Sequence, residues 1–76
     1  MLKHIETVSV CLAYISAIEY RDFSGLNDDE EKWVDAFLAE FGSCKFEWSE
    51  TTEFATDYIS GLMGDCLECK VFKWVD

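Results

Sequence analysis

The chain contains no proline, one histidine, and only six lysine and arginine residues against sixteen aspartates and glutamates. Without proline, repeats or a low-complexity tract, nothing in its 76 residues marks a linker, so we predict a single small domain over residues 1–76. A formal net charge of -10 repels nucleic acid and anionic lipid head groups. This argues against direct binding to DNA, RNA or a membrane surface, and any charged partner is expected to be basic.

A long unbroken apolar run is also missing. The first 20 residues are partly apolar, but Glu6 and Glu19 interrupt them and no small-residue cleavage pattern follows. This stretch resembles neither a signal peptide nor a segment that crosses a bilayer. The sequence therefore predicts a cytoplasmic protein, whose four cysteines are expected to be reduced thiols rather than a disulfide framework.

Half of the residues are hydrophobic and 16% are aromatic, so the chain can bury a core in spite of its size. Residues 7–20 have the spacing of an amphipathic helix, with apolar side chains three and four positions apart. These side chains are Val8, Cys11, Leu12, Ile15 and Ile18. The β-branched residues of "IETVSV" leave a strand open at the start of this segment.

A second helix over residues 28–41 is the best-defined element. Asn27 is a good N-cap, and Glu30 three residues later completes an approximate capping box. Acids in the first turn are stabilised by the helix dipole by a few tenths to about 1 kcal/mol each. Gly42 ends the helix. Its apolar face is formed by Trp33, Val34, Phe37, Leu38 and Phe41.

After Gly42 the apolar period changes to two, which is typical of strands. Three strands are predicted, at residues 44–48, 54–60 and 66–75, joined by the turns "SETTE" and "GLMGD". We therefore predict an α+β fold in which two N-terminal helices pack on one face of a three-stranded antiparallel meander, in the order α-α-β-β-β. The other face stays partly exposed and leaves room for a homodimer. Its residues on the last strand are Glu68, Lys70, Phe72 and Trp74.

Cys66 and Cys69 form a C-x-x-C pair, which is a usual half of a zinc or redox site. On an alternating strand, however, residues three apart point to opposite faces. Cys11 and Cys44 stand alone in the sequence, so no second pair of ligands is available. We predict buried thiols, no metal and no cofactor. The alternative is a small zinc-binding domain built on this pair.

Nothing in the sequence indicates catalysis. His4 has no nucleophile or orienting carboxylate fixed beside it, and neither a Gly-rich phosphate loop nor a G-x-S-x-G motif occurs. Pairs of carboxylates are expected by chance among sixteen acids, and they need a pocket to have a chemical role. We predict that the protein is not an enzyme and has no catalytic residues.

The acids are clustered along the chain. Residues 28–40 hold six of them and one base, about one carboxylate per 3 Å of helix at roughly 1.5 Å per residue, close to the roughly 3.4 Å phosphate spacing along one DNA strand. Residues 46–69 add six more acids and no base. Solubility alone explains many acidic surfaces, but self-repulsion destabilises a small domain, and a basic partner would account for such clustering.

We therefore predict a binding surface made mostly of carboxylates. Aromatic side chains on the strands, Trp48, Tyr58 and Trp74, are further interface candidates because tryptophan and tyrosine dominate interface hot spots. The predicted partner-binding residues are Asp28, Asp29, Glu30, Glu31, Asp35, Glu47, Glu50, Glu53, Asp57 and Trp74.

The order of these segments resembles a family of small acidic proteins of unknown function from phages and other mobile elements of bacteria. The resemblance covers roughly residues 9–72 and is carried by "SGLNDDEEKWVDAFLAEFG", "FEW" and "ISGLMGDCLECKVF". The chain departs from the family at Ser60, where threonine is common, and at Cys69, where an apolar residue is usual. The second departure argues against a family-wide metal site at the C-x-x-C pair.

By size, charge and implied origin, the chain is similar to anti-CRISPR proteins, which block a CRISPR effector at its nucleic-acid-binding surface or at a subunit contact. The similarity implies a non-catalytic inhibitor in the cytoplasm of a bacterial host, bound to a basic surface of a nucleic-acid-handling complex. The alternative is a homodimeric structural or regulatory accessory protein of a mobile element, in which the acids only confer solubility.

Overall fold

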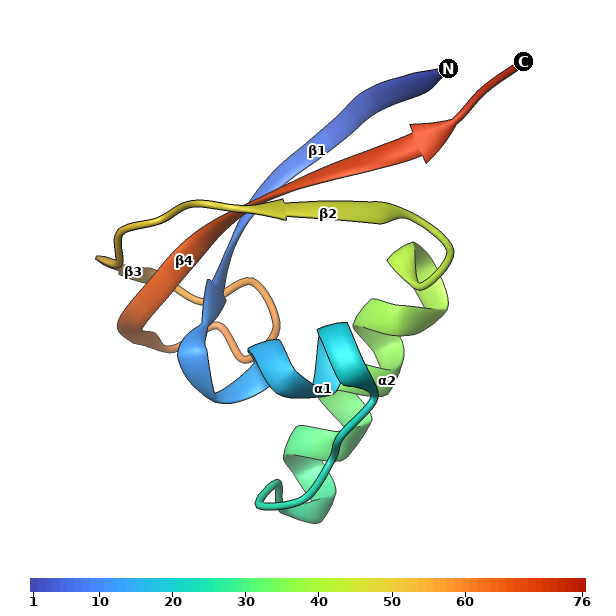
Figure 1. Ribbon diagram of the computed structural model, residues 1–76. Helices are drawn as coiled ribbons and strands as arrows, with labels where there is room; N and C mark the ends of the chain where they lie inside the picture. The colour runs from blue at the N-terminus through green and yellow to red at the C-terminus, as the bar shows by residue number, and fades with distance from the viewer.

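The computed structural model describes all residues, 1–76, and combines an antiparallel sheet of four strands with two α-helices (Figure 1). The α+β class is confirmed, but the predicted order and the predicted number of strands are wrong, because the chain begins with a strand. The elements are β1 (Leu2–Cys11), the 3-10 turn η1 (Leu12–Tyr14), α1 (Ile15–Tyr20), α2 (Asp28–Phe41), β2 (Lys45–Trp48), β3 (Glu53–Thr56) and β4 (Met63–Trp74).

Strand β1 replaces the first half of the helix predicted over residues 7–20. Val8 and Val10 are both buried and lie opposite Cys69 and Leu67 of β4, so the apolar period here is two. β-branched side chains suit a pleated surface. The helical part of the segment is α1, which begins only at Ile15.

Strand β4 lies in the centre of the sheet. It pairs with β1 along one edge, while β2 and β3 follow one another along the other edge and do not pair with each other. The predicted meander is therefore wrong. The reason lies at Ser49, whose N–H donates to the Glu68 carbonyl and whose Oγ accepts from the Glu68 N–H, each at 2.9 Å. These bonds hold the chain on β4 between β2 and β3, where a reversing turn was predicted.

The predicted second strand, residues 54–60, ends at Thr56, and β4 begins at Met63, before the predicted start at residue 66. Between them the chain turns in a loop, residues 57–62, closed by hydrogen bonds from Asp57 N–H to the Leu62 carbonyl and from Gly61 N–H to the Asp57 carbonyl. Gly61 has a φ of 74°, which favours glycine. This loop lies beside the end of β1, because the Tyr58 N–H donates to the Ser9 carbonyl at 2.7 Å.

The core lies between one face of the sheet and the two helices (Figure 1). Helix α2 contributes three fully or nearly fully buried side chains, and the rings of Phe37 and Phe41 lie 5.2 Å apart. Trp33, predicted on the same apolar face, is 38% exposed. The buried core residues are Val8, Val10, Tyr14, Ala17, Ile18, Val34, Phe37, Phe41, Cys69 and Val71.

The start of α2 is as predicted. The side chain of Asn27 accepts from the Glu30 N–H at 2.9 Å, and the Asn27 N–H donates to the Glu30 carboxylate at 3.0 Å. Asp28, Asp29 and Glu31 lie in the first turn with Glu30. The capping box therefore fixes where α2 begins and places these carboxylates in its first turn.

Strands β1 and β4 continue past β2 as a two-stranded ribbon that carries both chain termini (Figure 1). Leu2 pairs with Trp74, and the terminal amino group of Met1 donates to the Val75 carbonyl at 2.9 Å. The register shifts between His4 and Glu6, so the ribbon is irregular at that point.

Candidate protein-binding surfaces

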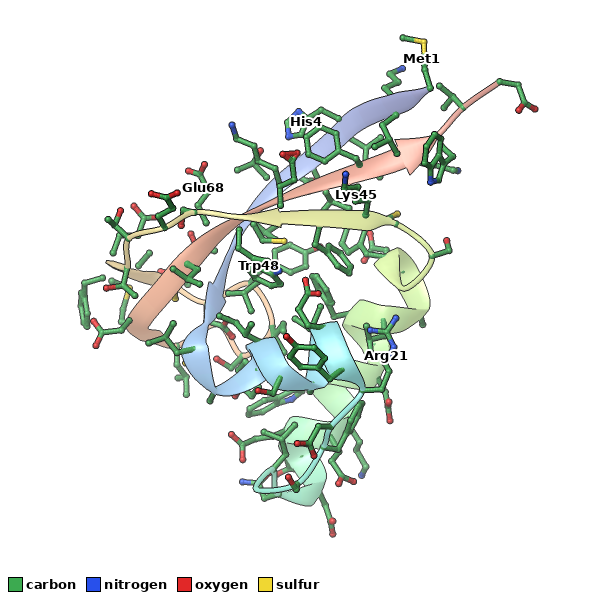
Figure 2. The ribbon with its side chains drawn as sticks, viewed as in Figure 1. Met1, His4, Arg21, Lys45, Trp48 and Glu68 are labelled. Atoms are coloured by element: carbon green, nitrogen blue, oxygen red, sulfur yellow. The ribbon has the colours of Figure 1, made fainter.

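Three of the predicted binding carboxylates, Glu47, Glu50 and Glu53, lie along the edge of the sheet that β2 and β3 form. Together with Glu68 of the central strand β4, they are called here the sheet-side acidic surface. Glu47 lies opposite Lys70, Glu53 opposite Cys66, and Glu68 opposite Ser9. Since alternate residues of a strand share a face, the Glu47, Glu53 and Glu68 side chains project from one face. Figure 2 shows Glu68 on the side of the sheet away from the helices.

The sheet-side acidic surface is open to solvent. Glu47, Glu50 and Glu53 are exposed, and Glu68 is half-buried. A shallow depression of about 220 Å³ beside it is lined by Glu47, Trp48, Ser49, Glu68 and Lys70. The Ser9 hydroxyl donates to the Glu53 carboxylate at 3.4 Å. A basic side chain placed in this depression can reach the carboxylates of both Glu47 and Glu68.

The second group of acids, the helix-side acidic surface, consists of Asp28, Asp29, Glu31 and Asp35 in the first two turns of α2. All are exposed except Glu31, which is half-buried. Figure 1 shows the start of α2 far from the connection between β2 and β3. The two acidic stretches of the sequence therefore form two separate surfaces.

Glu30 and Asp57, both predicted to bind a partner, are turned inward. Glu30 belongs to the capping box and also accepts a hydrogen bond from the Tyr14 hydroxyl at 3.2 Å. Asp57 is 2% exposed, and its carboxylate accepts from the Cys11 N–H at 2.6 Å and from the N–H and hydroxyl of Ser60 at 2.6 and 2.8 Å. The carboxylate oxygens of both residues already accept hydrogen bonds from within the fold, so we remove both residues from the binding surface.

Tyr14 is the residue whose hydroxyl donates to the Glu30 carboxylate. Burial raises the pKa of its hydroxyl, and the neighbouring Glu30 carboxylate raises that pKa further. Tyr14 is 4% exposed and belongs to the core cluster. The hydroxyl therefore stays protonated and serves as a hydrogen-bond donor within the fold.

The three aromatic interface candidates lie in different places. Trp74 is 67% exposed at the end of the ribbon, away from both acidic surfaces. Trp48 is directed toward α1, where its indole N–H donates to the Glu19 carboxylate (Figure 2). Tyr58 is 47% exposed, and its ring lies 6.0 Å from that of Phe37 beside a small groove between the 57–62 loop and α2.

Cys66 and Cys69 lie on opposite faces of β4. Cys66 pairs with Cys11, and Cys69 pairs with Val8 on the core side. Burial raises the pKa of the Cys69 thiol to about 12, with a further contribution from the Glu19 charge. No three side chains of histidine, cysteine, aspartate or glutamate are placed to hold a metal ion. The C-x-x-C pair therefore has the geometry of two separate thiols.

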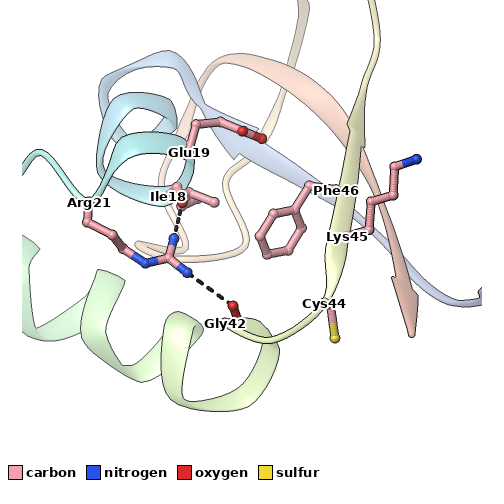
Figure 3. A pocket seen from close by; sticks show the side chains of 7 residues that line it. All are labelled: Ile18, Glu19, Arg21, Gly42, Cys44, Lys45 and Phe46. Atoms are coloured by element: carbon pink, nitrogen blue, oxygen red, sulfur yellow. Dashed lines mark hydrogen bonds between the residues drawn. The ribbon is translucent and has the colours of Figure 1, made fainter. Parts of the chain in front are cut away.

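Arg21 is a residue that the sequence analysis missed. It follows α1 with a φ of 56°, and its guanidinium donates to the Ile18 carbonyl and to the Gly42 carbonyl, the latter at 3.0 Å (Figure 3). The side chain thus links the ends of α1 and α2. It lines an open cavity of about 400 Å³ with Lys45 and Glu19.

His4 lies within β1 instead of in a mobile terminus. Its ring nitrogen is 2.7 Å from the Thr7 hydroxyl, and its ring lies 5.4 Å from that of Phe72 on the paired strand. No carboxylate or thiol shares these contacts with it. The surroundings of His4 are those of a sheet-surface side chain.

Comparison with protein-family models, with curated proteins and with solved structures finds no match for this chain. No helix of the protein is both long and apolar enough to cross a membrane. The case for a function therefore depends on the chain's own surfaces.

Proposed function

We propose that this protein is a non-catalytic inhibitor whose acidic surface binds a Lys/Arg-lined groove of a nucleic-acid-handling complex, with a CRISPR effector as the specific candidate. The sheet-side acidic surface is the observation that carries the proposal. Its side chains Glu47, Glu53 and Glu68 share one face of the sheet with two lysines, Lys45 at the start of β2 and Lys70 of β4. Occupation of the groove would exclude nucleic acid by charge and by volume.

The two acidic surfaces differ in what they contribute to folding. On the helix side, Asp28 and Asp29 are stabilised by the helix dipole, so their presence has a local structural reason. On the sheet side, Glu53 and Glu68 lie on either side of Ser9, and neither has a lysine or arginine as its cross-strand partner. No helix dipole offsets these charges, so binding explains their presence on this face more readily than folding does.

The net charge of the whole protein supports the same mechanism. At -10 the protein attracts a basic groove over a distance of about one Debye length, roughly 10 Å at 0.1 M salt. Such steering accelerates association, and pairing of rim charges contributes little per residue. We therefore expect binding that weakens steeply with salt and survives the loss of any single carboxylate.

The first experiment is a pull-down of the tagged protein from a lysate of a CRISPR-bearing bacterial host at low and high salt, with the retained proteins identified by mass spectrometry. The expected result is retention of effector subunits at low salt and their loss at high salt. Retention that is equal at both salt concentrations would contradict the charge mechanism.

Two variants with matched charge then identify the surface. Glu47→Gln/Glu50→Gln/Glu53→Gln and Asp28→Asn/Asp29→Asn/Asp35→Asn each remove three exposed negative charges. The sheet-side variant is expected to lose affinity for the retained complex by about tenfold or more, and the helix-side variant by much less. Equal losses would mean that net charge alone acts. If neither variant loses affinity, the sheet-side acidic surface is not the binding site.

A homodimeric accessory role is the second candidate, and the ribbon of β1 and β4 favours it. Two-stranded ribbons are marginally stable alone, and this one exposes apolar side chains at Ile5 (40%) and Trp74 (67%). Sedimentation over a range of concentrations measures the mass. A dimer that dissociates in the Trp74→Ser variant, together with no retained basic complex, would favour this role over inhibition.

A further inference from the structure

Cys11 and Cys66 lie directly opposite each other on the paired strands β1 and β4. The hydrogen bonds around them show whether the two residues form a hydrogen-bonded or a non-hydrogen-bonded pair of the antiparallel ladder. The Cys11 N–H donates to the Asp57 carboxylate, on the side of β1 away from β4. Two residues earlier on the same strand, the Ser9 carbonyl accepts from Tyr58, also away from β4. The backbone of Cys11 therefore makes no ladder bond with Cys66.

The backbone of β4 agrees with this assignment. Glu68, two residues after Cys66, directs its N–H and carbonyl to Ser49 on the opposite edge of β4. The backbone N–H and carbonyl of Cys66 therefore also point toward this edge of β4, where Cys66 pairs with Glu53 of β3. Cys11 and Cys66 thus form a non-hydrogen-bonded pair, in which Cα atoms are about 4.5 Å apart. That separation lies within the roughly 4.4–6.8 Å range of disulfides.

We propose that Cys11 and Cys66 form a reversible cross-strand disulfide when the protein meets a small oxidised thiol such as oxidised glutathione. This inference does not depend on the proposed function. Cys11 is half-buried and Cys66 is fully buried. The Cys66 Sγ lies 3.5 Å from the carbonyl oxygens of Ala55 and Gly64, to which its thiol is only a weak hydrogen-bond donor.

The reaction proceeds by two thiol–disulfide exchanges. The Cys11 thiolate attacks one sulfur of oxidised glutathione, so a mixed disulfide forms and one glutathione leaves as a thiolate that takes up a proton. The Cys66 thiol then loses its proton and attacks the Cys11 sulfur, and the second glutathione leaves in the same way. Two protein thiols are oxidised, and one glutathione disulfide is reduced to two thiols.

The surroundings of Cys66 determine the slower step. Burial raises the pKa of the Cys66 thiol, and the nearby Asp57 carboxylate raises that pKa further. A raised pKa leaves less thiolate at neutral pH, so closure of the disulfide is expected to accelerate with pH. Cys11 is the accessible thiol and is expected to carry the transient glutathione adduct.

The crosslink would tie the first strand to the last and enclose residues 12–65, which include both helices and the strands β2 and β3. Closure of a long loop reduces the entropy of the unfolded chain. For a chain of this size we expect the oxidised protein to melt about 10 °C or more above the reduced protein.

The test uses the wild-type chain, folded, in buffers of increasing oxidised-to-reduced glutathione ratio. After alkylation of the remaining thiols, the proteolytic peptides are mapped by mass spectrometry. The expected product is a peptide pair joined through Cys11 and Cys66, with Cys44 and Cys69 alkylated, and the link is expected to disappear on return to reduced glutathione. A link between any other two cysteines, or no link within one chain, would overturn the proposal.

Two variants separate this crosslink from general oxidation. Cys44→Ala/Cys69→Ala keeps the proposed pair and is expected to form the same disulfide, with the same rise in melting temperature. Cys11→Ser removes the entry thiol and is expected to show no rise in melting temperature on oxidation. If Cys11→Ser and the wild type gain the same thermal stability in oxidised glutathione, the pair is not the site.

Discussion

The Asp57 carboxylate accepts the Cys11 N–H at 2.6 Å, and this bond joins the loop after β3 to the end of β1. It brings together two residues that are far apart in the sequence. The same carboxylate also accepts both polar hydrogens of Ser60 within its own loop. Asp57 is therefore a structural acid in a chain whose other carboxylates are largely on the surface.

Replacement of Asp57 by alanine is expected to lower the free energy of unfolding by about 2–4 kcal/mol. The reason is that the half-buried N–H groups of Cys11 and Ser60 lose the charged acceptor that the buried Asp57 provides. Urea unfolding measures the effect. Asp65→Ala, which removes an exposed acid, is the matched control and should stay within about 0.5 kcal/mol of wild type. Equal effects of the two substitutions would contradict this role for Asp57.

Asn27→Ala is expected to lower the free energy of unfolding by about 1 kcal/mol. Alanine cannot accept the Glu30 N–H, so the first turn of α2 loses its side-chain cap. Asn27→Ser keeps a capping oxygen and should retain most of the stability. Helical circular dichroism during urea unfolding measures both variants. If alanine and serine are equally tolerated, the capping bond contributes nothing measurable.

Helix α2 could be predicted completely because its determinants are local. Asn27, Glu30 and Gly42 mark its ends within the segment itself, and the period of its apolar residues is unambiguous. The α+β class followed from the change of period after Gly42. Both results depend only on residues a few positions apart.

The start of the chain could not be predicted because Val8 and its apolar neighbours fit both a helix and a strand. Their period was decided by pairing with Cys69 and Leu67 at the other end of the sequence. The structural role of Asp57 could not be predicted for the same reason. In the sequence it resembles any surface acid, and only the contact of its loop with the end of β1 shows that it is buried. Contacts of this kind are distant in the sequence and leave no local pattern.

Arg21 provides a prediction that separates a side-chain effect from a backbone effect. Arg21→Ala is expected to lower the free energy of unfolding by about 1–2 kcal/mol, because the carbonyls of Ile18 and Gly42 lose their donor. Arg21→Gly loses the same bonds, but it should be about 1 kcal/mol more stable than the alanine variant, since the φ of 56° strains any residue with a Cβ. Urea unfolding of both variants tests this order, and a less stable glycine variant would contradict it.

The raised pKa of the Cys69 thiol predicts how the free energy of unfolding depends on pH. Burial raises its pKa from the ordinary 9.0 to about 12 in the folded state. The folded protein therefore holds this proton more tightly than the unfolded chain does. The resulting stability is fully present below pH 9 and is lost as the pH rises from 9 to about 12.

Over that range, in the presence of a reducing agent, the free energy of unfolding of the wild type is expected to fall more steeply than that of Cys69→Ala. The pKa values of Tyr14 and Tyr58 are also raised by burial. Both tyrosines are present in the wild type and in the variant, so the difference between the two curves isolates the thiol. Cys44→Ala, which removes a half-buried thiol, should follow the wild-type slope. Parallel curves for the wild type and Cys69→Ala would contradict this coupling of the buried thiol to folding. Water would then have to reach Cys69 in the folded core beside Val8.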